Sequence, residues 1–127
     1  MSALPKQLRR LALPLLLASI PAAAVPASPA RLPRLVDVGA GKCIPCKAMT
    51  PILEQIRQEY AGRLSVEFID VWKNPRAADP YRVEIIPTQV FFDASGREVS
   101  RHQGFMSKEE ILARFKSAGV PLAPATH

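Results

Sequence analysis

Residues 35–60 read LVDVGAGKCIPCKAMTPILEQIRQEY, and this stretch decides the fold. Its first four residues have the length and composition of a short buried strand interrupted by one acid, and the Gly-Ala-Gly at 39–41 ends that strand. Apolar residues then recur every three or four positions from Met49 to Tyr60, which predicts a helix from about Cys43 to Ala61. Pro51 lies inside this helix and is expected to kink it.

The segments after this helix predict three further strands. Residues 64–71 first alternate between apolar and polar residues and then become continuously apolar, which predicts a second strand. Because a helix joins this strand to the first one, the two strands should run parallel as a β-α-β unit. The polar stretch 74–81 predicts one or two helical turns. Residues 88–92 and 98–102 flank the turn sequence DASG, which predicts a hairpin whose second strand lies at the sheet edge.

The last helix carries start and stop signals. Ser107 and Glu110 have the spacing of a capping box, and Met106 and Ile111 can form the hydrophobic staple. Gly119 stands where the helix should end.

Length and composition fit one domain with an appendage. The chain has 127 residues, 48% of them hydrophobic, and 2 cysteines, too few for a multi-bridge framework or a four-thiolate zinc site. We expect residues 31–120 to form the domain, residues 121–127 to be a frayed tail, and residues 1–30 to be a signal peptide and Pro/Ala-rich link.

The leader has the pattern of a secretory signal. Its basic start, with Lys6, Arg9 and Arg10, runs into an apolar stretch from Leu11 to Val25 that ends among small residues. The alternative is an uncleaved membrane anchor, but these 15 residues fall short of the roughly 20 that span hydrocarbon. The pattern predicts a periplasmic or otherwise extracytoplasmic protein.

The charge distribution does not favour nucleic acid as a partner. The net charge is +6, but residues 1–30 supply three basic residues and no acid, which leaves 14 basic against 11 acidic residues elsewhere. These charges are scattered, with no basic stripe among aromatic residues, so we expect no nucleic-acid binding.

The motif Cys43-Ile44-Pro45-Cys46 carries the chemistry. It lies where a strand gives way to a helix, and unpaired backbone N–H groups and the helix dipole stabilise a thiolate at that position. Cys43 should therefore ionise below the pKa of about 8.5 of a free cysteine and act as a nucleophile. Cys46, three residues on, can close a disulfide with it, and Pro45 stiffens that small ring.

Two other uses of the cysteine pair stay open. So small a ring is a poor structural crosslink, because it closes almost no chain. Two thiolates at this spacing could instead hold Cu(I) or half of a zinc site. No third ligand is evident nearby, because His102 and His127 are distant in sequence, so no metal ligand is assigned.

Several linked motifs follow one another along the chain. They are Asp37 six residues before Cys43, C-x-P-C with Lys47, Pro51 in PILEQI, Asn74-Pro75, Ile86-Pro87-Thr88 and Gly104. Together these motifs make residues 35–119 resemble the thioredoxin family. The resemblance implies a thioredoxin-like α/β fold, β-α-β then β-β-α, trimmed at the N-terminus to about four strands in a mixed sheet. One sheet face should then be thinly covered, by the link around residues 32–35 or by a partner.

The resemblance also implies roles for individual residues. Cys43 would attack a disulfide and Cys46 would resolve the mixed disulfide, with the Cys43–Cys46 pair as the redox group and no other cofactor. Asp37 would be a buried carboxylate that relays the proton of Cys46, or else a structural acid at a strand end. Ile86 and Pro87, joined by a cis bond, would hold the substrate, together with Ile44 and Pro45.

Some positions depart from the family pattern. Phe68 stands where many members place a lysine beside the buried acid, and Gly39 and Lys42 stand where two tryptophans are common. Trp72 either covers the same surface from another side or packs the 75–81 segment. These changes argue against the usual cytoplasmic partners and flavoprotein reductase.

The predicted function is an exported protein-disulfide reductase or isomerase. Pro45 before the second cysteine resembles reductants, since strong oxidants tend to carry a histidine there. The resemblance implies recharging by a membrane-embedded thiol transporter, and exported proteins with disulfides, apocytochrome c among them, as substrates.

Overall fold

A computed structural model describes residues 31–126 of the chain. The leader and its cleavage region, with residue 127, lie outside the described residues. The elements follow the predicted order of β-α-β and then β-β-α. They are β1 (Arg34–Gly39), α1 (Ile44–Glu59), β2 (Ser65–Asp70), the 3₁₀ helix η1 (Pro75–Tyr81), β3 (Thr88–Phe92), β4 (Glu98–Gln103) and α2 (Lys108–Ser117).

The strands form one mixed sheet in the order β2-β1-β3-β4. β1 runs parallel to β2 and antiparallel to β3, and β3 pairs with β4 as the predicted hairpin with β4 at the edge. Within residues 31–126 the sheet has four strands, as expected for the trimmed thioredoxin-like fold. The register places Asp37 of β1 between Phe68 of β2 and Gln89 of β3.

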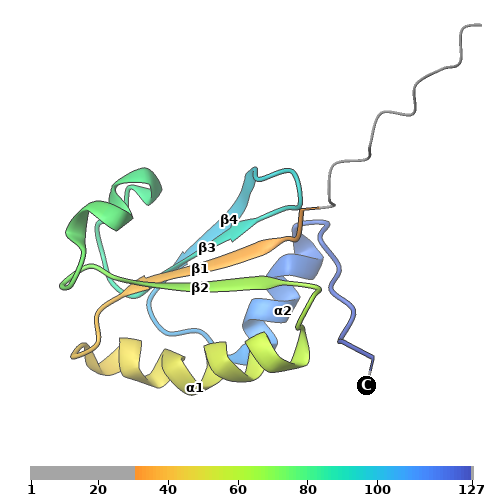
Figure 1. The fold of residues 1–127 in the computed structure, drawn as a ribbon, viewed down its shortest axis with the longest axis horizontal. Coiled ribbons are helices and arrows are strands. Elements are labelled where there is room, and N and C mark those ends of the chain that lie inside the picture. Colours follow the sequence, from red (N-terminus) through yellow and green to blue (C-terminus); the bar gives the residue numbers. More distant parts are fainter. Residues whose placement is uncertain (1–30, 127) are drawn as a thin grey trace, which may run out of the picture.

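Both α-helices cover one face of the sheet (Figure 1). The apolar stripe predicted for the first helix is buried there, and α1 runs through Pro51 without a break. The rings of Phe91 in β3 and Phe115 in α2 pack edge to face with centroids 4.9 Å apart. Burying each such side chain contributes about 1.5–3 kcal/mol. The core on this face comprises Leu35, Met49, Leu53, Ile56, Tyr60, Leu64, Phe91, Met106, Ile111 and Phe115.

The other face of the sheet is covered by η1 and its flanking segments, drawn in green in Figure 1. The sequence predicted that one face would be thinly covered and would need the link at 32–35 or a partner. For the patch formed by Val36, Val38, Ile69 and Val90, this prediction is wrong. The segment Val71–Val83 supplies the cover from within the domain, while Leu32 of the link stays 40% exposed. The covered side chains are Val36, Val38, Ile69 and Val90.

The signals predicted for the last helix are all used. Glu110 N–H donates to Ser107 Oγ at 3.3 Å and Ser107 N–H donates to Glu110 Oε2 at 2.8 Å, which makes a complete capping box. Met106 and Ile111 are both buried in the core. Gly119 follows the helix with a φ of +78°, a left-handed conformation that favours glycine.

The tail, predicted to fray, contacts the rest of the domain at two of its residues. Leu122 packs against the helix-covered core, and Ala125 N–H donates to Glu59 O at 2.8 Å at the end of α1. The hydrogen bond joins the tail to the end of α1, an element distant in sequence, so local sequence does not reveal it. Among residues 31–126, no helix is both long and apolar enough to cross a membrane.

Candidate active site

Cys43 and Cys46 are joined by a disulfide at the start of α1. Their Cα atoms lie 5.1 Å apart. Cys43 is the N-cap residue and is partly exposed, whereas Cys46 is 1% exposed. Only the first sulfur is therefore open to another protein.

The helix start around Cys43 favours negative charge. In the part of the chain that the structure describes, no side chain caps the N-terminus of α1, and the first turn of this helix contains no acid. Unpaired N–H groups and the positive end of the helix dipole are therefore left to interact with a Cys43 thiolate. Pro45 occupies a first-turn position, where its missing N–H removes no helical hydrogen bond.

The Ile86–Pro87 turn lies at the same end of the sheet as the cysteine pair. The Ile86–Pro87 bond is cis, and β3 begins at the next residue. Because Thr88 pairs with Val38 near the end of β1, Pro87 lies beside the point where the chain leaves β1 for Cys43. The carbonyl of Pro87 accepts a hydrogen bond from Gly104 N–H at 2.7 Å.

Asp37 is fully buried behind the cysteine pair. Alternate residues of a strand point to the same face. A Cβ built at Gly39 would lie 3.1 Å from Cys46 Sγ, so the side chain of Asp37, two residues earlier in β1, lies on the face of the sheet that meets Cys46. Burial raises the pKa of Asp37 from 3.8 to about 6, although a hydrogen bond from Gln89 acts in the opposite direction.

Gly39 permits the close approach of two side chains. The Cβ built there would also lie 3.1 Å from Phe68 Cε2, so Cys46 and the Phe68 ring both occupy the space that a side chain at 39 would fill. Phe68 thus contributes apolar surface beside Cys46. This surface helps to explain why the carboxyl of Asp37 is poorly solvated.

Sequence reasoning missed Gln89 as a site residue. Its Nε2 donates to Asp37 Oδ1 at 2.8 Å, and its side chain is fully buried. The available signal was one polar residue inside the apolar strand TQVFF, but only the register of β1 and β3 shows that it faces Asp37.

Asp70 was also missed. Its Oδ2 accepts from Gly41 N–H at 3.0 Å, and its Oδ1 accepts from the N–H groups of Trp72 and Lys73 at 3.0 and 3.2 Å. These bonds lower the pKa of Asp70 against the opposing effect of desolvation. Asp70 therefore ties the loop before Cys43 to the loop after β2.

Exposed apolar side chains surround this end of the sheet. Ile44, next to Cys43, is 82% exposed. Trp72 is 59% exposed and lines a small pocket with Gly41 and Lys42, so it lies beside the loop before Cys43. Of the two expectations for Trp72, this position favours cover of the active-site surface over packing of the 75–81 segment. Ile85 and Phe105 are also about half exposed.

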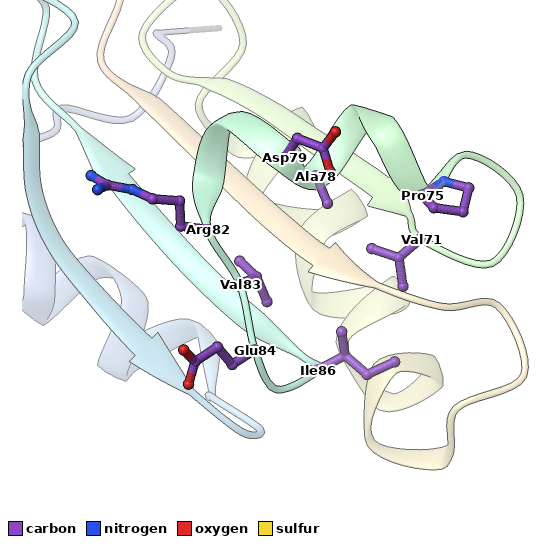
Figure 2. Close-up of a pocket in the computed structure, with 8 residues that line it drawn as sticks. All are labelled: Val71, Pro75, Ala78, Asp79, Arg82, Val83, Glu84 and Ile86. Carbon is purple, nitrogen blue, oxygen red and sulfur yellow. The ribbon is translucent and has the colours of Figure 1, made fainter.

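A pocket of about 500 Å³ lies against η1, on the sheet face opposite α1. Figure 2 shows side chains from the residue after β2, from η1 and from the 82–86 connection lining it. Ile86 of this lining directly precedes Pro87. Its lining residues are Val71, Pro75, Ala78, Asp79, Arg82, Val83, Glu84 and Ile86.

The metal alternative gains no further ligand from the structure. Residues 31–126 contain no group of three or more His, Cys, Asp or Glu side chains placed to hold an ion. His102 instead has its Nε2 at 3.2 Å from Phe105 O.

Comparisons with known proteins agree with this architecture. The family model described as Thioredoxin matches residues 27–117. A thioredoxin of Acidithiobacillus ferridurans is 41% identical over 81 residues, which cover 64% of this chain and 74% of that protein. A thioredoxin of Staphylococcus aureus is 38% identical over 78 residues, which cover 61% and 74%. A solved structure titled "Structure of a malarial protein" has the same fold, with a TM-score of 0.64 at 19% identity over 69% of this chain and 98% of its own.

The fold and the cysteine pair define a thiol–disulfide oxidoreductase. The chain belongs to the thioredoxin family.

Proposed function

We propose that this oxidoreductase is exported and reduces or isomerises disulfides in extracytoplasmic proteins. The observation that carries the proposal is the asymmetry of the pair: Cys43 is partly exposed at an uncapped helix N-terminus, and Cys46 is buried behind it. The leader supports export, because a basic start precedes an apolar stretch that is short for a membrane span.

The first step is attack by the Cys43 thiolate on a disulfide of the substrate protein. A bond forms between Cys43 Sγ and one substrate sulfur, and the other substrate sulfur leaves as a thiolate that takes a proton from solvent. The helix N-terminus stabilises the attacking thiolate before the step, and Lys42 and Lys47 flank it with exposed positive charge.

In the second step Cys46 resolves the mixed disulfide. The Cys46 thiol gives its proton to Asp37, and its sulfur attacks Cys43 Sγ. The bond between Cys43 and the substrate breaks, and the second substrate sulfur leaves as a thiolate. Two electrons have then passed to the substrate, and the protein holds the Cys43–Cys46 disulfide. Asp37 suits this transfer because burial raises its pKa to about 6, which makes it a stronger base than an exposed carboxylate.

The substrate would lie across the Ile86–Pro87 turn. The backbone of Ile86 would pair with an extended segment that contains the substrate cysteine, as in β-strand addition. Ile44 and Pro45 are both exposed beside Cys43 and would contact the same segment. The pocket that Ile86 lines (Figure 2) offers room for one side chain of the substrate segment.

Reduction requires a source of electrons outside the cytoplasm. We infer a membrane-embedded thiol transporter as donor, which would reduce the Cys43–Cys46 disulfide by the reverse of the same exchange. Apocytochrome c and wrongly oxidised exported proteins are the substrate candidates.

The activity is tested by reduction of insulin disulfides with wild type, Cys43→Ser and Cys46→Ala. Wild type should be active and Cys43→Ser inactive, because only Cys43 is accessible. Cys46→Ala should accumulate mixed disulfides, whose isolation from the periplasm identifies natural substrates. Equal activity of wild type and Cys43→Ser would overturn the proposal.

A further inference from the structure

Asp37 and Gln89 form an isolated polar pair inside the apolar part of the domain. Both side chains are fully buried, and they are linked by the 2.8 Å bond from Gln89 Nε2 to Asp37 Oδ1. Their outer atoms, Asp37 Oδ2 and Gln89 Oε1, form no hydrogen bond with any other group of residues 31–126. Buried polar atoms are rarely left unpaired unless the site has a use for them.

The elements packed around Asp37 offer few ionisable groups. Its cross-strand neighbours, Phe68 and Gln89, do not titrate. From α1 the facing ionisable group is Cys46. On β4, His102 pairs with Gln89 and lies one strand further away. The protonation of Asp37 is therefore set by burial, by Gln89 and by exchange with Cys46.

We propose that Gln89 is a positioning residue for the proton transfer of the resolving step. It occupies Asp37 Oδ1, so Oδ2 is the oxygen left free to take the proton of Cys46. This inference rests on the proposed function, because it assumes that Asp37 accepts that proton.

The amide of Gln89 can serve both protonation states of the carboxyl. Its N–H donates to the ionised form, and its Oε1, which accepts no hydrogen bond from residues 31–126, has the acceptor capacity that a protonated carboxyl could use. When Cys46 loses its proton, the O–H bond forms at Asp37 Oδ2. The proton then leaves toward the departing substrate thiolate or solvent, which returns Asp37 to the ionised state.

The test is the pH dependence of mixed-disulfide resolution in Gln89→Leu. Leucine has nearly the same volume but cannot donate to the carboxylate, so the ionised form of Asp37 loses its hydrogen bond. The rate of resolution should still rise with pH as Asp37 ionises, but its midpoint should move upward by about one pH unit. A mixed disulfide of Cys43 with a small aromatic thiol, whose release is followed by absorbance, reports this step alone.

Val90→Ala is the matched control. Val90 is the next residue of β3, equally buried but on the opposite sheet face. Its truncation should destabilise the fold and leave the pH midpoint where it is in wild type. The relay through Asp37 is supported if the resolution rate depends on pH in wild type and loses this dependence in Asp37→Asn. If the midpoint in Gln89→Leu is then the same as in wild type, the role of Gln89 is overturned and the relay remains. A wild-type resolution rate without this pH dependence would remove the relay and the inference with it.

A second measurement needs no variant, in case Gln89→Leu does not fold. In the reduced wild-type protein, the side-chain amide resonances of Gln89 should shift with pH at the same midpoint as the Asp37 carboxyl carbon. Amide resonances that stay constant through that midpoint would contradict the proposal.

Discussion

At the scale of the residue, the ionised carboxylate of Asp37 weakens the fold. Burial raises its pKa from 3.8 to about 6. Because the folded state favours the protonated carboxyl, the contribution of Asp37 to the free energy of unfolding is fully present below pH 3.8. This contribution is lost as the pH rises through about 6. Two pH units correspond to about 3 kcal/mol, a large fraction of the stability of a small domain. The protein therefore keeps at this position a group that works against folding at neutral pH.

Asp37→Asn should remove this pH-dependent cost. We predict that the oxidised variant is about 2–3 kcal/mol more stable than wild type at pH 8, and that the difference disappears near pH 3.5, where Asp37 is protonated. Urea unfolding at the two pH values measures this. A stability difference that is the same at both would show that Asp37 titrates normally.

At the scale of the element, most of the structure follows from local patterns. Periodicity and turn chemistry predicted all four strands and both α-helices, because each has its own apolar pattern, cap or flanking turn. The short helix η1 was predicted from the polar stretch 74–81. Cys43 and Cys46 were predictable for the same reason, since spacing and helix start lie in one segment. Gln89 and Asp70 were not, because their partners come from other strands or loops and only the sheet register brings them together.

The cap of α2 gives a prediction at this scale. Ser107→Ala removes the acceptor for Glu110 N–H and should destabilise the domain by about 1 kcal/mol. Ser117→Ala, the same substitution at the other end of α2, should change stability by less than about 0.5 kcal/mol, because that serine only donates to the nearby Arg114 O. Thermal unfolding of both variants checks this; equal losses would mean that the capping box has no special weight.

At the scale of the whole molecule, contacts distant in sequence complete the fold. Lys108 of α2 forms an ion pair with Glu59 of α1 at 3.1 Å, and the tail after Gly119 packs over the same region. The segment around η1 covers the patch Val36, Val38, Ile69 and Val90 on the opposite face of the sheet. These contacts bury apolar side chains on both faces of a four-stranded sheet, which sequence patterns alone did not show.

The tail should therefore contribute to stability. Leu122→Ala removes a partly buried side chain from the core and should cost about 1 kcal/mol. The exposed Thr126→Ala is the control and should have no measurable effect. Chemical denaturation of the two variants distinguishes them, and a Leu122→Ala variant as stable as wild type would restore the view of a frayed end.

The central claim is that the Cys43 sulfur is ionised and accessible at neutral pH, and alkylation of the reduced protein tests it most directly. Iodoacetamide reaction followed against pH, with mass spectrometry to locate the label, should show Cys43 modified before Cys46. Its rate should be half-maximal well below pH 8.5, where a free cysteine titrates. Half-maximal reaction near pH 8.5, or first labelling at Cys46, would contradict the account.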